Sequence, residues 1–255
     1  YLFYIGYVVI DNVLTQDEVN ATRIEINKML DKSDLFEINE NGDESVRKDK
    51  VHWISEPISG QKSILGEKLL HALRTVRAIP QEFSDIIGYE GIDLGVPYSN
   101  QLACYDGLNA HYIAHRDTPE VNDDEFQHPL SFLITPGMQE RKLTVILYLN
   151  ESTWDSNGGG LIDNGNLKCY INADMTDVTG ETASEIVKIE PIGGRMIIFD
   201  SKKILHEVCP TASRRVALTC WSGGNHSQHE WMRFLFIPPA EIDFKYIISN
   251  FTNFK

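Results

Sequence analysis

The chain has 255 residues, 42% of them apolar, which fits a single domain with a sizeable hydrophobic core. Its formal net charge of −14 argues against nucleic acid or an anionic membrane as a partner, because both require a basic footprint. No apolar run approaches the length needed to cross a bilayer, and no basic segment precedes an apolar stretch at the N-terminus.

The helical signals lie in the N-terminal part. A helix should span residues 15–30, because Thr15 can cap it and Glu18, three residues later, completes a capping box. Apolar residues at helical spacing predict a second helix over 64–86, which Pro80 should break or kink.

From residue 99 onward the pattern changes to short runs of β-forming residues separated by turns. The predicted strands, after a first one at 4–10, are 99–106, 110–116, 142–150, 159–162, 166–171, 186–190, 195–200, 205–209, 214–222 and 230–237. Helices followed by many short strands predict an α+β fold, mainly β, in which a sandwich or jelly roll carries the helices on one sheet. We expect one domain over 1–255, with 1–98 as helix-rich support, 99–237 as the jelly-roll core and 238–255 as a C-terminal tail.

Cysteine usage indicates a reducing compartment. Cys104, Cys169, Cys209 and Cys220 show neither a redox pair nor zinc-finger spacing, and most of them lie in predicted strands as small hydrophobic residues. We therefore expect a cytoplasmic protein, although the chain starts at Tyr1 and a targeting segment could precede it.

The triplet His115-Arg116-Asp117 has the spacing of a metal site. Residues i and i+2 of a strand point the same way, so His115 and Asp117 could bind one ion while Arg116 points to the other face. Together with His206 they could cover one face of a metal octahedron and leave the remaining positions open, as in non-haem iron(II) oxygenases.

An anion site is predicted beside this triad. If the run 214–222 pairs with the strand of His206, Arg215 can project into the same cavity, and its planar guanidinium suits a carboxylate. This arrangement indicates an anionic co-substrate, for which Arg214 is the rival ligand.

Further motifs occur in a fixed order along most of the chain. They are R-K-D-K-V-H-W at 47–53, A-C-Y at 103–105 with H-R-D at 115–117, R-K-L-T at 141–144 with Y-L-N at 148–150 and Trp154, and H-E-V-C-P at 206–210 with Arg215 and Trp221. In this order they resemble the motifs of the iron(II)- and 2-oxoglutarate-dependent dioxygenases, above all the prolyl 4-hydroxylases of the oxygen-sensing group and their protist relatives.

The resemblance implies a distorted double-stranded β-helix that uses iron(II), 2-oxoglutarate as co-substrate and O2, and it raises ascorbate as a further cofactor. It implies that the metal-binding and catalytic residues are His115, Asp117 and His206, that the 2-oxoglutarate-binding residues are Arg215, Tyr148, Tyr105 and Thr219, and that the substrate region contains Asp49, Trp53, Arg141 and Trp221. On the same basis, we expect an ion pair between Asp49 and Arg141 to orient the segment 47–53 over the iron.

The implied reaction is hydroxylation of an unactivated C–H bond, foremost prolyl 4-hydroxylation of a protein or peptide. The sequence departs from the family at Gly160-Leu161-Ile162-Asp163, where the family has G-x-L-R, and it has long segments at 118–140 and 164–185. These departures keep a second hypothesis open, an oxygenase of a small molecule such as a proline-like amino acid or a biosynthetic intermediate. The intact triad and Arg215 argue against a third, a binding domain without catalysis.

Overall fold

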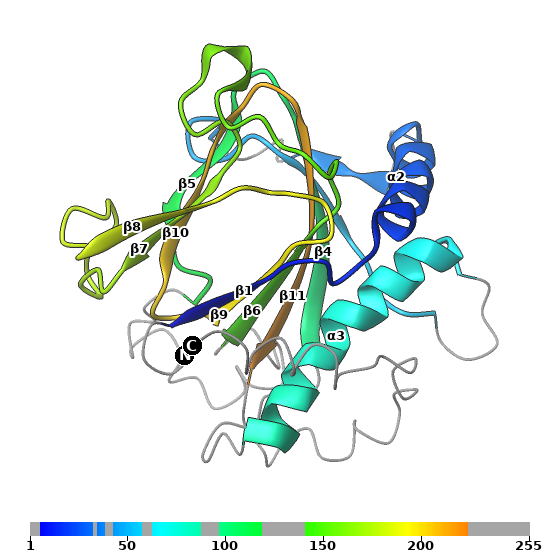
Figure 1. Ribbon diagram of the computed structural model, residues 1–255, viewed down its shortest axis with the longest axis horizontal. Helices are drawn as coiled ribbons and strands as arrows, with labels where there is room; N and C mark the ends of the chain where they lie inside the picture. Colours follow the sequence, from blue (N-terminus) through cyan, green and yellow to red (C-terminus); the bar gives the residue numbers. More distant parts are fainter. Residues whose placement is uncertain are drawn as a thin grey trace.

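The computed structural model describes residues 6–32, 35–38, 43–57, 63–87, 97–118 and 141–223. Two antiparallel sheets face each other, and two helices cover the outer face of the larger sheet (Figure 1). This arrangement confirms the predicted jelly roll, the distorted double-stranded β-helix, with its supporting helices.

The larger sheet contains, within the described ranges, seven strands in the order β1-β9-β6-β11-β4-β3-β2. Their bounds are β1 (Tyr7–Ile10), β2 (Glu37–Ile38), β3 (Lys50–Trp53), β4 (Pro97–Asp106), β6 (Arg141–Tyr148), β9 (Met196–Asp200) and β11 (Arg214–Gly223). The smaller sheet has the order β5-β10-β7-β8, with bounds β5 (Ala110–His115), β7 (Leu167–Ile171), β8 (Glu185–Ile189) and β10 (Leu205–Thr211).

Most predicted strands are therefore found, with two kinds of exception. Residues 159–162 do not form a strand, because the first two of them belong to a 3-10 turn, η2 (Gly158–Gly160), in which Gly159 and Gly160 have φ of 65° and 77°. A run of glycines offers no side chains to a sheet, so the apolar pair after it did not define a strand. The short strands β2 and β3 were not predicted, and the predicted strand at 230–237 lies outside the described residues.

Helix α2 (Gln16–Leu30) begins with the predicted capping box, in which the Thr15 hydroxyl accepts from the Glu18 backbone and the Glu18 carboxylate accepts from the Thr15 N–H. Helix α3 (Glu67–Ile87) contains Pro80, so the predicted break there is wrong. Proline removes one helical hydrogen bond, but the buried face around Ile79 packs on the sheet and the helix continues. Within the described part of the chain, no helix is both long and apolar enough to cross a membrane.

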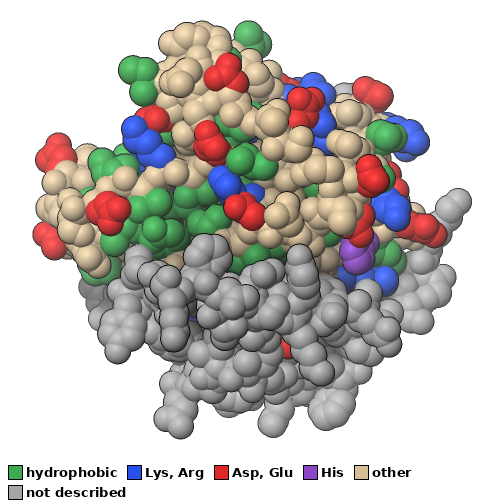
Figure 2. All heavy atoms as spheres, viewed as in Figure 1, with side chains coloured by type: hydrophobic (Ala, Val, Ile, Leu, Met, Phe, Trp, Pro, Cys, Tyr) green, Lys and Arg blue, Asp and Glu red, His purple; other side chains and the backbone are tan. Residues whose placement is uncertain are grey.

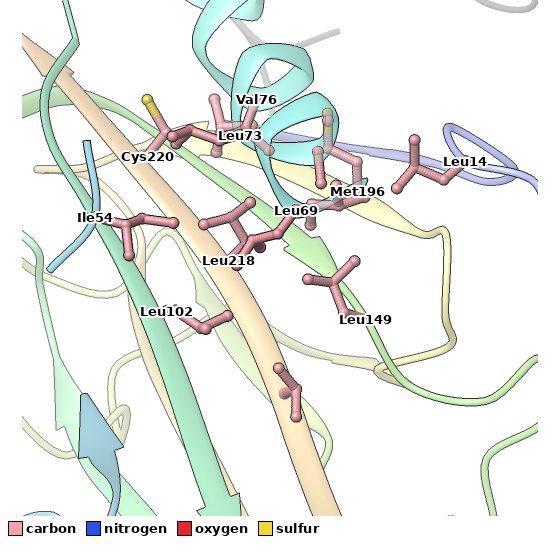
Figure 3. Close-up of a cluster of buried hydrophobic side chains, with 14 of the residues drawn as sticks. Leu14, Ile54, Leu69, Leu73, Val76, Leu102, Leu149, Met196, Leu218 and Cys220 are labelled. Carbon is pink, nitrogen blue, oxygen red and sulfur yellow. The ribbon is translucent and has the colours of Figure 1, made fainter. Parts of the chain in front are cut away.

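Side chains that alternate along the strands of the large sheet contribute to two separate hydrophobic cores, one on each face of the sheet. On β6, Val145 and Leu147 belong to the cluster between the sheet and the helices, whereas Ile146 and Tyr148 belong to the cluster between the two sheets. Figure 3 shows the outer cluster, where apolar side chains of α3 such as Leu73 meet side chains of the large sheet. The inner cluster consequently surrounds the space in which a ligand could be held.

Surface charges contribute little to this architecture. Acidic and basic side chains lie interspersed on the described part of the face in Figure 2, and pairs such as Arg23 with Glu151 are solvent-exposed. An exposed pair contributes about 0–1 kcal/mol. Apolar burial on both sides of the large sheet is therefore the main source of stability.

The two helices are joined by a capping contact. The carboxylate of Glu25 on α2 accepts hydrogen bonds from the backbone N–H groups of Lys68 (3.2 Å) and Leu69 (2.8 Å) in the first turn of α3. A Cβ added at Gly66 would lie 2.1 Å from Cδ of Glu25. A side chain at position 66 would therefore exclude the carboxylate that caps α3.

We expect Gly66→Ala to lower the free energy of unfolding by about 1–2 kcal/mol, because the methyl group displaces Glu25 from the helix terminus. Urea unfolding of the wild type, Gly66→Ala, Glu25→Ala and the double variant tests this. In a Glu25→Ala background the same glycine substitution should cost much less, since the clash is gone. An equal cost in both backgrounds would contradict the capping explanation.

Candidate metal centre and co-substrate site

The three predicted metal ligands converge at one end of the smaller sheet. His115 is the last residue of β5 and pairs directly with His206 of β10. Asp117 lies in the bend after β5, so the premise that a single strand carries both ligands of the triplet is wrong. The bend nevertheless returns the carboxylate, and the three ligand atoms lie within 4.8 Å of one another.

Backbone carbonyls fix the tautomer of both imidazoles. Nδ1 of His115 lies 2.8 Å from the carbonyl oxygen of Ile113, and Nδ1 of His206 lies 3.1 Å from that of Ile204. A carbonyl can only accept, so each Nδ1 carries the proton and each Nε2 offers its lone pair. Nε2 of His115 and of His206 lie 3.8 and 3.9 Å from the Asp117 carboxylate, so all donors face one point.

Burial and mutual charge keep these groups in their metal-binding forms. Burial and the neighbouring His206 lower the pKa of His115 well below its usual range, so the ring is neutral near pH 7. Burial alone raises the pKa of Asp117, but the two histidines and the Thr144 hydroxyl outweigh it and the net pKa is lowered. A neutral His115 beside an ionised Asp117 suits the donor set that divalent iron takes.

The anion site lies deeper between the sheets. Arg215 is 1% exposed, and its Nε donates to the carbonyl oxygen of Gly165 at 2.9 Å. Its guanidinium carbon lies 5.0 Å from the ring centre of Tyr105 and 5.1 Å from that of Tyr148. No carboxylate among the described residues pairs with this buried cation, and the hydroxyl of Tyr148 has no hydrogen-bond partner there. An unpaired buried charge costs several kcal/mol, so the arrangement fits an anionic ligand.

The neighbouring Arg214 has a different environment. It lies at the surface, where Nε donates to the Asp106 carboxylate at 2.9 Å. Alternation along β11 separates the two arginines, since Arg215, Thr219 and Trp221 share the inner face while Arg214 lies on the outer one. The geometry thus favours Arg215 for the anion role.

A cavity of about 200 Å³ joins the triad to the anion site. The predicted site residues that line it, besides the triad and Arg215, are Tyr105, Thr219, Trp53, Arg141 and Trp221. Two predicted residues do not line it, since Tyr148 is buried behind Arg215 and Asp49 lies behind Arg47.

Comparison with known proteins agrees with this donor set. Residues 100–223 match the family model of the 2OG-Fe(II) oxygenase superfamily. This stretch of the chain is therefore similar to that superfamily. The partly buried histidine–aspartate–histidine set of the chain fits iron(II). Arg215, which pairs with no carboxylate of the described residues, fits the far carboxylate of 2-oxoglutarate, so the residues present match both groups.

Proteins similar to this chain include prolyl hydroxylases. The hypoxia-inducible factor prolyl hydroxylase of Caenorhabditis elegans is 26% identical over 225 residues, which cover 85% of this chain and 26% of that protein. The chain therefore spans about a quarter of the length of that curated relative.

Solved structures show the same architecture. A Trichoplax adhaerens prolyl hydroxylase, in complex with a peptide fragment of the hypoxia inducible factor oxygen degradation domain, is 26% identical with a TM-score of 0.62, covering 87% of this chain and 85% of that one. A Pseudomonas putida prolyl-4-hydroxylase is 22% identical with a TM-score of 0.60, covering 88% and 95%, and supports the fold alone.

Aromatic rings and a guanidinium line the mouth of the oxygenase cavity. The guanidinium carbon of Arg141 lies 4.1 Å from the ring centre of Trp221, and the rings of Trp221 and Trp53 are 6.0 Å apart. Trp53 is 46% exposed, so this pair forms an apolar rim at which a substrate can be recognised.

The predicted ion pair between Asp49 and Arg141 is wrong. Asp49 instead accepts two hydrogen bonds of 2.7 Å from Arg47, two residues earlier, while Arg141 lies on Trp221. Arg47 is closer because both residues belong to one short segment, and its planar fork matches the buried carboxylate.

Several contacts around the iron ligands were not predicted from the sequence. The ring of Tyr112 stacks on that of His115 with centroids 3.7 Å apart, and Arg47 lies 4.4 Å from the centre of the Tyr112 ring. Arg116, predicted to have no part in the site, donates to the carbonyl oxygens of Ala173, Asp174 and Asp177. Arg116 thereby anchors the loop between β7 and β8 next to the end of β5.

We expect Arg215→Lys to weaken 2-oxoglutarate binding on the order of 10- to 100-fold, because an ammonium group cannot replace the planar fork in a fixed cavity. Arg214→Lys is the matched control and should change the Kd less than about twofold, as expected for an exposed pair. Calorimetric titration with 2-oxoglutarate under anaerobic iron(II) measures both. A larger effect at position 214 would place the anion site on the other face of β11.

Proposed function

We propose that this protein is a prolyl hydroxylase that acts on a peptide or protein segment, with His115, Asp117 and His206 as its iron ligands. Arg215 would hold the far carboxylate of 2-oxoglutarate. The observation that carries the proposal is one cavity that contains both the donor triad and a buried guanidinium without an acidic partner among the described residues.

In the mechanism, bound iron(II) with 2-oxoglutarate and O2 supplies the oxidising power that inserts an oxygen atom into a substrate C–H bond. Asp117, through its carboxylate, and the two histidines, through Nε2, would hold the metal. Arg215 would bind the co-substrate carboxylate and so orient the other end of that molecule, while Tyr148, packed behind Arg215, would support the guanidinium. Catalysis needs no side-chain general base here, and the protein contributes orientation and exclusion of water.

The proposed substrate is inferred from the residues at the mouth of the cavity and from the similar prolyl hydroxylases. Flat aromatic faces such as those of Trp53 and Trp221 pack well against a proline ring, as in other proline-recognition grooves. Relatives at 26% identity are named for prolyl hydroxylation, and one of them was solved with a peptide. The small-molecule hypothesis has no comparable support.

We further propose that residues 1–255 act as one dioxygenase domain in a cytoplasmic setting. The helices of the N-terminal part share a core with the sheet that bears the site, which supports a single domain. The four cysteines are buried and free, and burial raises the pKa of each thiol, as suits a reducing compartment.

We expect proline-containing peptides to stimulate succinate release far more than free proline or other cyclic amino acids do. The assay measures succinate and hydroxylated product with iron(II), 2-oxoglutarate and O2. Stimulation by free amino acids alone would reassign the enzyme to small-molecule oxidation.

Asp117→Ala should abolish succinate formation that is coupled to peptide oxidation, because the metal loses its anionic ligand. Asp174→Ala is a matched control, since that side chain is exposed and lies in the β7–β8 loop. Coupled turnover at the wild-type rate in Asp117→Ala would contradict the assignment of the triad.

A further inference from the structure

Two buried hydroxyl groups lie behind the Asp117 carboxylate. The Thr144 hydroxyl on β6 donates to Oδ2 of Asp117 at 2.7 Å, and it lies 2.8 Å from the hydroxyl of Ser201. Thr144 and Ser201 are both 0% exposed, so no solvent competes for these bonds. Neither residue lines the cavity, and both therefore act on the site from outside it.

The direction of the protons follows from the chemistry of the groups. A hydroxyl has one proton, and an ionised carboxylate can only accept. The Thr144 proton therefore goes to Asp117, and the bond between the hydroxyls is donated by Ser201. This is a two-step chain, from Ser201 to Thr144 to Asp117, with one acceptor at its end.

The backbone fixes the far end of this chain. The N–H of Ser201 donates to the carbonyl oxygen of Lys142 at 3.1 Å, and its own carbonyl accepts from the N–H of Thr118 at 3.2 Å. Ser201 is thus tied both to the strand of Thr144 and to the residue that follows Asp117. These backbone bonds keep the main chain of Ser201 next to both Thr144 and Asp117.

We infer that Thr144 and Ser201 position Asp117 as a ligand that offers a single oxygen to the metal. With one lone pair of Oδ2 taken by Thr144, chelation of the ion by both carboxylate oxygens is disfavoured. Hydrogen bonds of this kind typically tune metal affinity by 10- to 100-fold. The inference rests on the proposed function, because it takes Asp117 to be a metal ligand.

Titration of the metal-free protein with Co(II), followed by the visible absorption of the bound ion, tests the inference. Thr144→Val removes the hydroxyl at nearly constant volume, and we expect it to weaken Co(II) binding on the order of 10- to 100-fold and to alter the absorption bands. Thr144→Ser should restore both. Thr75→Val is the matched control, since Thr75 is buried in α3 and donates to a helix carbonyl, and it should leave Co(II) affinity unchanged.

Ser201→Ala separates positioning from folding. We expect it to weaken Co(II) binding by a smaller factor, and we expect Thr144→Val with Ser201→Ala to bind no worse than Thr144→Val alone, because Ser201 acts through Thr144. Additive losses would overturn the chain. Where Thr144→Val does not fold, unchanged Co(II) binding in Ser201→Ala overturns it as well.

The proposed function and this inference fail differently. A wild-type protein that does not bind Co(II) would remove the metal centre itself. A wild type that binds, together with a folded Thr144→Val variant of equal affinity and unchanged spectrum, would leave the metal centre standing and refute the positioning role.

Discussion

The pairing of β5 with β10 is the constraint on which the site depends. It sets His115 directly opposite His206, and β10 is itself held in register by β7 on its other side. Because side chains alternate along a strand, a slip of one residue would turn one imidazole to the outer face and destroy the convergence. The convergence of the candidate metal ligands is thus a consequence of strand register, and the β7–β10 pairing helps to hold that register.

The interior of the molecule contains a buried positive charge, that of Arg215, with no negative partner among the described residues. Arg215 lies against two tyrosine rings, donates a hydrogen bond to the backbone carbonyl of Gly165, and pairs with no carboxylate of the described residues. Such a cation destabilises the ligand-free fold, and the apolar layers on both faces of the large sheet offset that cost. An anion that binds there restores the balance, so co-substrate affinity and fold stability are linked through one residue.

The sequence predicted the parts of the structure that are governed by local rules. The capping box of Thr15 and the alternation along β11 both follow from spacing, and the structure agrees with them. Arg215 could be separated from Arg214 only as a preference, because the choice depends on which face of β11 meets the inner space. The predicted break at Pro80 is wrong because tertiary packing of α3 outweighs the local cost of a proline within a helix.

Contacts between distant segments could not be predicted in the same way. Asp49 pairs with Arg47 rather than Arg141, and Thr144 meets Asp117, because of how the segment before β3 and the bend after β5 approach the sheets. A buried threonine in a strand has an ordinary β-propensity explanation, so its sequence context carried no sign of this role. The same holds for Arg116, whose three carbonyl acceptors lie some sixty positions further along the chain, at 173–177.

The bend after β5 shows that the i, i+2 rule explains only part of how His115 and Asp117 come together. The i, i+2 rule places two ligands on one face of a strand, yet β5 ends at His115 and Asp117 lies beyond it. What returns the carboxylate is Thr118, whose N–H donates to the Ser201 carbonyl and whose hydroxyl donates to the carbonyl of Arg141. The histidine and the aspartate are therefore brought together by a bend that is held by hydrogen bonds, and the candidate metal site depends on three chain segments rather than on one strand.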